Sequence, residues 1–229
     1  MAAGSGTLPA ESVRAMFDRI AGVYDVMNTV MTAGLHHRWR ARAVDLARVG
    51  PGTRALDVAT GTGDLALELA ARGGDVVGSD FAEGMLARAR TKAPELTWER
   101  ADAMALPYPD DAFDAATVGF GARNFSDLAL GVGEMVRVVR PGGRVVVLEI
   151  TTPQKPPLST FFALWFDRVV PLLGRFDEAY TYLPSSVKRF PEPRALAGVL
   201  ASAGCRDVGW ILTAGGIIAL HFGTVDGER

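Results

Sequence analysis

The apolar positions of this chain follow two different periods. Between residues 11 and 49 they recur three or four residues apart, which is the spacing of one face of a helix. The first such face comprises Val13, Met16, Phe17 and Ile20, and a second helical run follows over about 37–46. After Pro51-Gly52, short apolar runs of strand length alternate with helical stretches. The pattern predicts a helical N-terminal segment followed by a layered α/β fold.

The alternating part predicts five parallel strands with helices between them. The strand runs are RALDVAT, DVVGSD, LTWERAD, FDAATVGF and RVVVLEIT, and the helices are expected over about 64–71, 82–93 and 128–139. This alternation is typical of a doubly wound sheet, whose ligand binds beyond the carboxyl ends of the strands. Further on, a helix over about 192–203 precedes two strand-like runs, 207–213 and 217–224, joined at Gly215-Gly216. We expect these two runs to form a closing hairpin.

A glycine-rich turn follows the first predicted strand, in the sequence LDVATGTGD. Gly61 and Gly63, on either side of Thr62, adopt positive φ easily and allow a ligand to approach the backbone. Asp80 ends the next strand about 20 positions later, where an acid binds the ribose hydroxyls of a nucleoside cofactor. The turn also fits the fingerprint of dinucleotide enzymes, so the spacing predicts an adenosyl cofactor without distinguishing nicotinamide from other kinds.

Composition and charge narrow the class of protein. The 24 basic and 26 acidic side chains of the 229 residues form no long block of one sign, so we expect no nucleic acid partner. Cys205 is the single cysteine, which excludes an intramolecular disulfide and fits a reducing cytoplasm. The first fifteen residues lack the pattern of a signal peptide, and no run reaches ~18 apolar residues. We expect a cytoplasmic protein that is soluble or peripheral to a membrane.

Several features resemble class I methyltransferases that use S-adenosylmethionine. Asp57 lies inside the first strand, where these enzymes usually carry an acid. Asp102 and Ala103 open a segment, ADAMALPYPDDAFD, that is similar to the one that holds adenine in them. The resemblance implies a Rossmann-like sheet of seven strands, the last antiparallel, with S-adenosyl-L-methionine as cofactor. The implied cofactor-binding residues are Asp57, Gly61, Thr62, Gly63, Asp80, Asp102 and Ala103.

Two longer stretches resemble the ubiquinone/menaquinone C-methyltransferase family. The first is Tyr24-Asp25-Val26-Met27-Asn28, followed by Thr32, His36 and Trp39, and the second is RVVRPGG at 137–143, continuing to Glu149 and Thr151. The similarity extends over about residues 12–223. Departures are Thr32 and Thr151 in place of serine, Arg140 in place of lysine, Ala59 where many relatives carry glycine, and Gly119 where some place a serine that contacts the cofactor.

This family resemblance implies methyl transfer to a ring carbon of a polyprenylated quinol. Deprotonating an adjacent hydroxyl activates that carbon, so the protein has to favour the phenolate. Arg123 cannot be a simple base because its pKa exceeds ~12, but it could stabilise a phenolate or position a water. Asn124 could orient the same oxygen, or it could only cap the following helix. Tyr24 and Asp25 either form another wall of the acceptor pocket or only pack between helices. The histidines show no ligand spacing, so we expect no metal.

We expect a single methyltransferase domain over residues 1–229. Its predicted parts are an N-terminal helical cap (10–49), a cofactor-binding core (53–152), an insertion over the acceptor site (153–190) and a C-terminal helix and hairpin (191–229). The apolar run from Phe161 to Leu173 either lines a channel for the prenyl tail, touches a membrane surface transiently, or packs in the core. The sequence leaves the oligomeric state open, with a homodimer as one alternative.

The acceptor expected from the resemblance is a polyprenylated naphthoquinol, demethylmenaquinol, which is methylated to menaquinol. The alternatives are a benzoquinol of the ubiquinone route, both quinols, or another small hydrophobic acceptor. Two other classes also remain open at this point: a non-catalytic adenosyl-binding scaffold and an NAD-dependent oxidoreductase.

Overall fold

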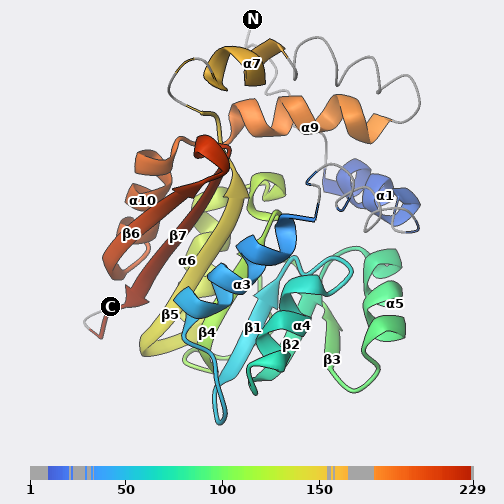
Figure 1. Ribbon diagram of the computed structural model, residues 1–229. Coiled ribbons are helices and arrows are strands. Elements are labelled where there is room, and N and C mark those ends of the chain that lie inside the picture. The colour runs from blue at the N-terminus through green and yellow to red at the C-terminus, as the bar shows by residue number, and fades with distance from the viewer. Residues whose placement is uncertain are drawn as a thin grey trace, which may run out of the picture.

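The computed structural model describes residues 10–20, 22, 29, 32, 34–153, 156, 158–164 and 178–227. A single seven-stranded sheet, in the order β3-β2-β1-β4-β5-β7-β6, forms its centre (Figure 1). The first five strands are β1 (Arg54–Val58), β2 (Asp75–Asp80), β3 (Thr97–Arg100), β4 (Phe113–Gly119) and β5 (Val139–Ile150). They pair in parallel, while β7 (Ile218–Val225) runs antiparallel between β5 and β6 (Cys205–Thr213). The predicted class I methyltransferase sheet, with its reversed last strand, is confirmed.

Helices cover both faces of this sheet. One face carries α3 (His36–Ala47), α4 (Asp64–Ala71) and α5 (Glu83–Lys92), and the other carries α6 (Leu128–Val138) and α10 (Pro193–Ser202). Successive strand residues supply the two cores in turn: Leu56 and Val145 face α6 and α10, whereas Ala55 and Val146 face α3 and α4. Burial on both faces explains why these strands read as continuous apolar runs.

The strand boundaries lie within two residues of the sequence prediction except at β5. We expected this strand to begin at Arg144, after a Pro-Gly-Gly turn, but it already begins at Val139, which pairs with Phe113. The register then shifts, and Arg144 pairs with Ala115. Residues 140–143 therefore form an irregularity inside the strand, where Gly142 adopts a φ of 79°. The sequence predicted the Pro-Gly-Gly turn correctly, but it did not predict that this turn interrupts a strand that has already begun to pair with β4.

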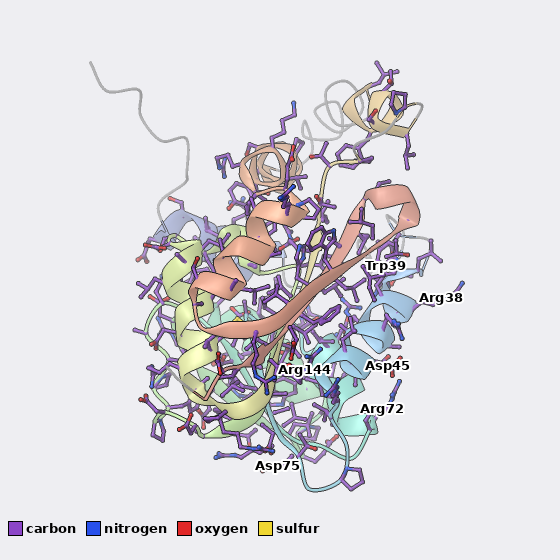
Figure 2. All side chains as sticks on the ribbon, turned by 90° about the vertical axis from the view of Figure 1, so that its left-hand side faces the viewer. Arg38, Trp39, Asp45, Arg72, Asp75 and Arg144 are labelled. Atoms are coloured by element: carbon purple, nitrogen blue, oxygen red, sulfur yellow. The ribbon has the colours of Figure 1, made fainter. Side chains whose placement is uncertain are left out.

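Charged side chains fix α3 against the sheet. The Nε of Arg144 on β5 donates to the carbonyl of Leu46 at 3.1 Å, and its Nη1 donates to Thr224 on β7 at 2.7 Å. Asp45 on α3 pairs with Arg72, next to the end of α4, at 2.6 Å. Figure 2 shows Asp45 and Arg72 side by side, with Trp39 further along the same helix. The helix α3 is therefore an integral layer of the fold.

Further helices lie at the carboxyl ends of the strands. Figure 1 shows α7 (Leu158–Leu164) and α9 (Glu178–Arg189) above the sheet, with α1 (Ala10–Ile20) beside them. In α1, Asp18 accepts the N–H of Gly84 in α5 at 2.7 Å, which ties the two helices together. Among the described residues, none of the helices is both long and apolar enough to cross a bilayer.

Candidate active site

A cavity opens at the carboxyl ends of β1, β2, β3 and β4. It lies where the strand order reverses between β1 and β4, the place at which a doubly wound sheet binds its ligand. The predicted residues that line it are Asp57, Gly61, Thr62, Asp80, Asp102, Ala103 and Asn124. Apolar walls come from Phe17, Phe81, Met85 and Phe125. One cavity thus brings together the cofactor candidates and one of the catalytic candidates.

The glycine turn has the geometry that the sequence predicted. Gly61 and Gly63 adopt φ angles of 59° and 88°, and α4 begins directly after Gly63. A Cβ at Gly63 would lie 2.5 Å from the Trp98 ring, so packing also requires glycine there. At Gly61 a Cβ would meet no protein atom within 4 Å. The open space at Gly61 is what a ligand lying against the backbone needs.

The carboxylate of Asp80 is held in place by the backbone. Its Oδ2 accepts the N–H of Gly61 at 2.8 Å, and its Oδ1 accepts the N–H of Ala82 at 2.9 Å. Burial raises the pKa of Asp80 to about 6, although the backbone hydrogen bonds act in the opposite direction. Asp80 therefore joins the turn after β1 to the end of β2, on the wall of the cavity.

Asp57 is buried at the end of β1 and accepts two hydroxyl groups. Thr60 donates to it at 2.5 Å and Thr117 at 2.7 Å. Burial raises the pKa of Asp57 to about 6, against the effect of these hydrogen bonds. A second carboxylate with a raised pKa thus faces the same cavity as Asp80.

A buried cation that the sequence analysis missed also lines the cavity. Arg40 on α3 pairs with Asp64, the first residue of α4, at 3.0 Å. Lys92 pairs with the same carboxylate at 2.8 Å and donates to Thr62 at 3.0 Å. Burial would raise the pKa of Asp64, but Arg40 and Lys92 lower it below the usual value. The available signal was an arginine on the apolar face of α3, among the buried residues His36, Arg40, Ala43, Val44 and Ala47.

The backbone bends sharply after β4. Phe120 has a φ of 61°, which is rare for a bulky side chain, and its N–H donates to the Leu148 carbonyl at 2.8 Å. A Cβ on the neighbouring Gly119 would lie 3.0 Å from Leu65, so a serine there would press on this leucine. The contact leaves little room for a larger residue at this position.

The two catalytic candidates after this bend behave differently. Both belong to the short helix η1 (Ala122–Asn124), and among the described residues Asn124 lines the cavity whereas Arg123 does not. The Arg123 guanidinium pairs with Glu149 at 2.7 Å, and the two side chains are only 8% and 1% exposed. Asn124 does not cap α6, because Asp127 accepts the Leu130 N–H there at 3.0 Å. Tyr24 and Asp25 lie outside the described residues.

A sheet of this order, with an adenosyl-type cradle at its switch point, defines a class I S-adenosylmethionine-dependent methyltransferase. Among the described residues, no group of three His, Cys, Asp or Glu side chains could hold a metal ion. The model of the ubiE/COQ5 methyltransferase family matches residues 6–225, and the chain belongs to this family.

Individual relatives agree with this assignment. The chain is 49% identical to a demethylmenaquinone methyltransferase of Thermus thermophilus over 91% of this chain and 99% of the relative. It is 42% identical to a ubiquinone/menaquinone biosynthesis C-methyltransferase of Geobacter sulfurreducens, over 95% and 90% of the two chains. A solved SAM-dependent methyltransferase of Thermotoga maritima, described as a possible histamine N-methyltransferase, shares the fold. Its TM-score is 0.65 at 18% identity, over 92% of this chain and 98% of that one.

Proposed function

We propose that this protein methylates demethylmenaquinol to menaquinol with S-adenosylmethionine as methyl donor. The observation that carries the proposal is the single cavity in which a nucleoside-type cradle and the Asn124 amide lie together. The relatives named above support the naphthoquinol as acceptor, and the relative from Geobacter sulfurreducens keeps a benzoquinol of the ubiquinone route as the alternative.

The cradle residues divide the work of holding the cofactor. Asp80 accepts the ribose hydroxyls, while Asp102 and Ala103 hold the adenine. The turn from Gly61 to Gly63 would let the ligand lie against its backbone. Asp57 would attract the positively charged part of S-adenosylmethionine. Arg40 faces the carboxylate of the amino-acid part. The described charges fit a ligand that carries both signs, because Asp57, Asp64 and Arg40 line the same cavity.

When bound, S-adenosylmethionine supplies a methyl group on a positively charged sulfur. Transfer of that methyl group to a quinol ring carbon would form a carbon–carbon bond, leave the sulfur neutral in S-adenosylhomocysteine and release the proton of that carbon to solvent. The protein favours this step by stabilising the oxyanion of the adjacent hydroxyl and by aligning the ring carbon with the methyl group. Asn124 orients the oxygen. The roles of Arg123, whose guanidinium is paired with Glu149, and of Tyr24 and Asp25 stay predictions.

The test is transfer of labelled methyl to chemically reduced demethylmenaquinone. A demethylated benzoquinol and a reaction without acceptor run in parallel. We expect label in the naphthoquinol; label in both quinols would make the enzyme dual, and label in neither, despite cofactor binding, would exclude quinols as acceptors. Titration with NADH, followed by fluorescence, should give no binding signal, since an oxidoreductase would require one.

Contact with a membrane surface would bring the lipid-soluble acceptor to the enzyme. Leu164, the last residue of α7, is 57% exposed, and α7 lies above the carboxyl ends of the strands (Figure 1). The rest of the apolar run, from residue 165 onward, is outside the described residues. Flotation with vesicles that carry the quinol should recruit the wild-type protein, and Leu164→Glu should reduce that recruitment; absence of wild-type recruitment would refute the contact.

A homodimer through the edge of the sheet is a separate proposal. β6 is the last strand in the sheet order, and it exposes Trp210 and Leu212 by 41% and 47%. Exposed apolar side chains on an unpaired edge favour association of two copies. Light scattering after gel filtration should give a dimer mass for the wild type and a monomer mass for Leu212→Lys. A wild-type monomer mass would exclude the dimer.

A further inference from the structure

Tyr182 connects the helix above the cavity to the cavity wall. It lies on α9, and its hydroxyl donates to Oδ1 of Asn124 in η1 at 3.0 Å, across 58 positions of sequence. α9 packs against η1, and the guanidinium of Arg189, seven positions further along the helix, lies 5.9 Å from the Tyr182 ring centroid. Tyr182 is half-buried and burial raises the pKa of its hydroxyl, so it stays a protonated donor at neutral pH.

The direction of this hydrogen bond decides what Asn124 offers to a ligand. An asparagine amide has one end that only accepts and one end that only donates. Because the tyrosine hydroxyl occupies the oxygen, the NH₂ group is the end that remains for the cavity. An NH₂ group binds an oxygen that has lost its proton better than a hydroxyl that still has a proton to donate.

The charge beside Asn124 is already balanced. Arg123 and Glu149 form a buried pair at 2.7 Å, and Glu149 also accepts the Arg123 backbone N–H at 3.2 Å. Glu149 on β5 thereby fixes the backbone of η1, while Tyr182 on α9 fixes the side-chain amide of Asn124. Of these polar groups, the Asn124 amide is the one that lines the cavity.

We propose that Tyr182 is a positioning residue for methyl transfer, since its hydroxyl holds the Asn124 amide with the NH₂ group directed at the acceptor's oxyanion. This inference rests on the proposed function, because it assigns the acceptor's oxygen to Asn124. It makes α9 part of the acceptor site and explains how a helix from residues 178–189 influences the chemistry at the end of β4.

The kinetic test compares Tyr182→Phe with Ser185→Ala. Ser185 donates to the Tyr182 backbone carbonyl at 2.7 Å, so its substitution removes a hydroxyl from the same helix without touching Asn124. Tyr182→Phe should lower kcat about tenfold with unchanged affinity for S-adenosylhomocysteine, whereas Ser185→Ala should leave kcat within about twofold. Equal losses in both variants would overturn the proposal.

A double-mutant cycle separates positioning from a general structural role. In an Asn124→Ala background, Tyr182→Phe should cause no further loss of kcat, because the amide that it orients is gone. Losses that multiply would show that Tyr182 acts independently of Asn124 and would contradict the proposal. The melting temperatures of the four proteins control for damage to the fold.

A binding test does not depend on turnover. 2-Hydroxy-1,4-naphthoquinone is an anion at neutral pH and 2-methyl-1,4-naphthoquinone is neutral; both are titrated into the protein saturated with S-adenosylhomocysteine. Tyr182→Phe should weaken binding of the anion several-fold and leave the neutral quinone unchanged. If wild type binds the anion more tightly than Tyr182→Phe does but methylates no quinol, the proposed acceptor is wrong, while the positioning of the Asn124 amide by Tyr182 holds. If the anion does not bind, or binds equally well to Tyr182→Phe, the inference is wrong.

Discussion

At the scale of single residues, Asp80 is the most informative acid of the site. It anchors both the glycine turn and the start of α5 through two backbone N–H groups, and it faces the cavity. Asp80→Ala should raise the dissociation constant of S-adenosylmethionine roughly ten- to a hundredfold, since hydrogen bonds to a charged group are worth about 1.5–3 kcal/mol. Titration calorimetry measures this change. Asp75→Ala, at the exposed start of the same strand, is the matched control; equal affinity of both variants would refute the assignment.

Ala59 allows a test of backbone strain. Its φ is 50°, a left-handed conformation that costs a residue with a Cβ about 1–2 kcal/mol. Ala59→Gly removes that cost but loses about 0.4–1 kcal/mol through the more flexible unfolded chain. We expect a net gain of about 0.5–1 kcal/mol in the free energy of unfolding in urea. Ala87→Gly, exposed inside α5, should instead lose about 1 kcal/mol, and a loss of that size at Ala59 as well would show that its φ carries no strain.

Spacing identified the glycine turn and Asp80 because their roles depend on the local backbone. Asp57 and Asp102 were implied by the resemblance to class I methyltransferases, and all three acids line the cavity beside that turn. Arg40 was missed because its role depends on how α3 packs against α4, which no local pattern records. The pairing of Arg123 with Glu149 depends in the same way on two neighbouring strand ends, 26 positions apart.

At the scale of elements, the hydrogen bonds by which α6 holds the loop after β3 can be tested, and we call this contact the clamp. Arg137 on α6 donates to the carbonyls of Leu106 and Tyr108 at 3.0 and 2.8 Å, and it pairs with Glu134 at 2.6 Å. The loop begins with Asp102 and Ala103 at the cavity. Arg137→Met should therefore lower the free energy of unfolding by about 1–2 kcal/mol and weaken cofactor binding several-fold, with kcat at saturation retained.

The control for this clamp lies three positions further on. Arg140 pairs with Asp114 and is more than half exposed, so Arg140→Met should change neither the affinity for the cofactor nor the stability by more than about 0.5 kcal/mol. Urea unfolding and titration calorimetry measure both quantities. If Arg137→Met retained full affinity, the loop would not need α6 to hold its shape.

Most helices were predictable because they follow the period that packing against a sheet imposes, and the strands because burial on both faces makes them continuous apolar runs. The helix α9, which contains Pro184, was not predicted. The ends of α4 and β2 agree with the structure to the residue. The errors arose where two local signals competed, as at Val139, which continues the ladder before the Pro-Gly-Gly turn. Asn124 could also be interpreted as a helix cap until the structure showed Asp127 in that position.

At the scale of the whole molecule, the cavity combines segments that are far apart in the chain. Phe17 from α1, Arg40 from α3 and Asn124 from η1 line one space, and α9 lies against η1. Sequence alone indicated that such a site exists through the family resemblance, but not which side chains meet there. The contact between Tyr182 and Asn124 is the clearest example, because neither residue has a pattern that points to the other.

The two buried carboxylates couple the stability of the whole protein to ligand binding and pH. Burial raises the pKa of both Asp57 and Asp80 to about 6, from 3.8 for an unperturbed aspartate. Between these values the native state binds more protons than the unfolded state, so the contribution of the two groups to stability falls as pH rises. That contribution is fully present below about pH 4 and is lost above about pH 6.

The ligand reverses this trend, because its ribose hydroxyls and its ammonium group are bound best by ionised carboxylates. At about pH 5.5 each carboxylate that has to be ionised should weaken binding about fourfold relative to about pH 7.5. We therefore expect a fixed concentration of S-adenosylhomocysteine to raise the melting temperature more at the higher pH. The asparagine of Asp80→Asn cannot ionise, so the ligand should raise the melting temperature of this variant less. The remaining pH dependence of that increase should come from Asp57 alone. A wild-type shift that is independent of pH would mean that neither carboxylate has to be ionised to hold the ligand.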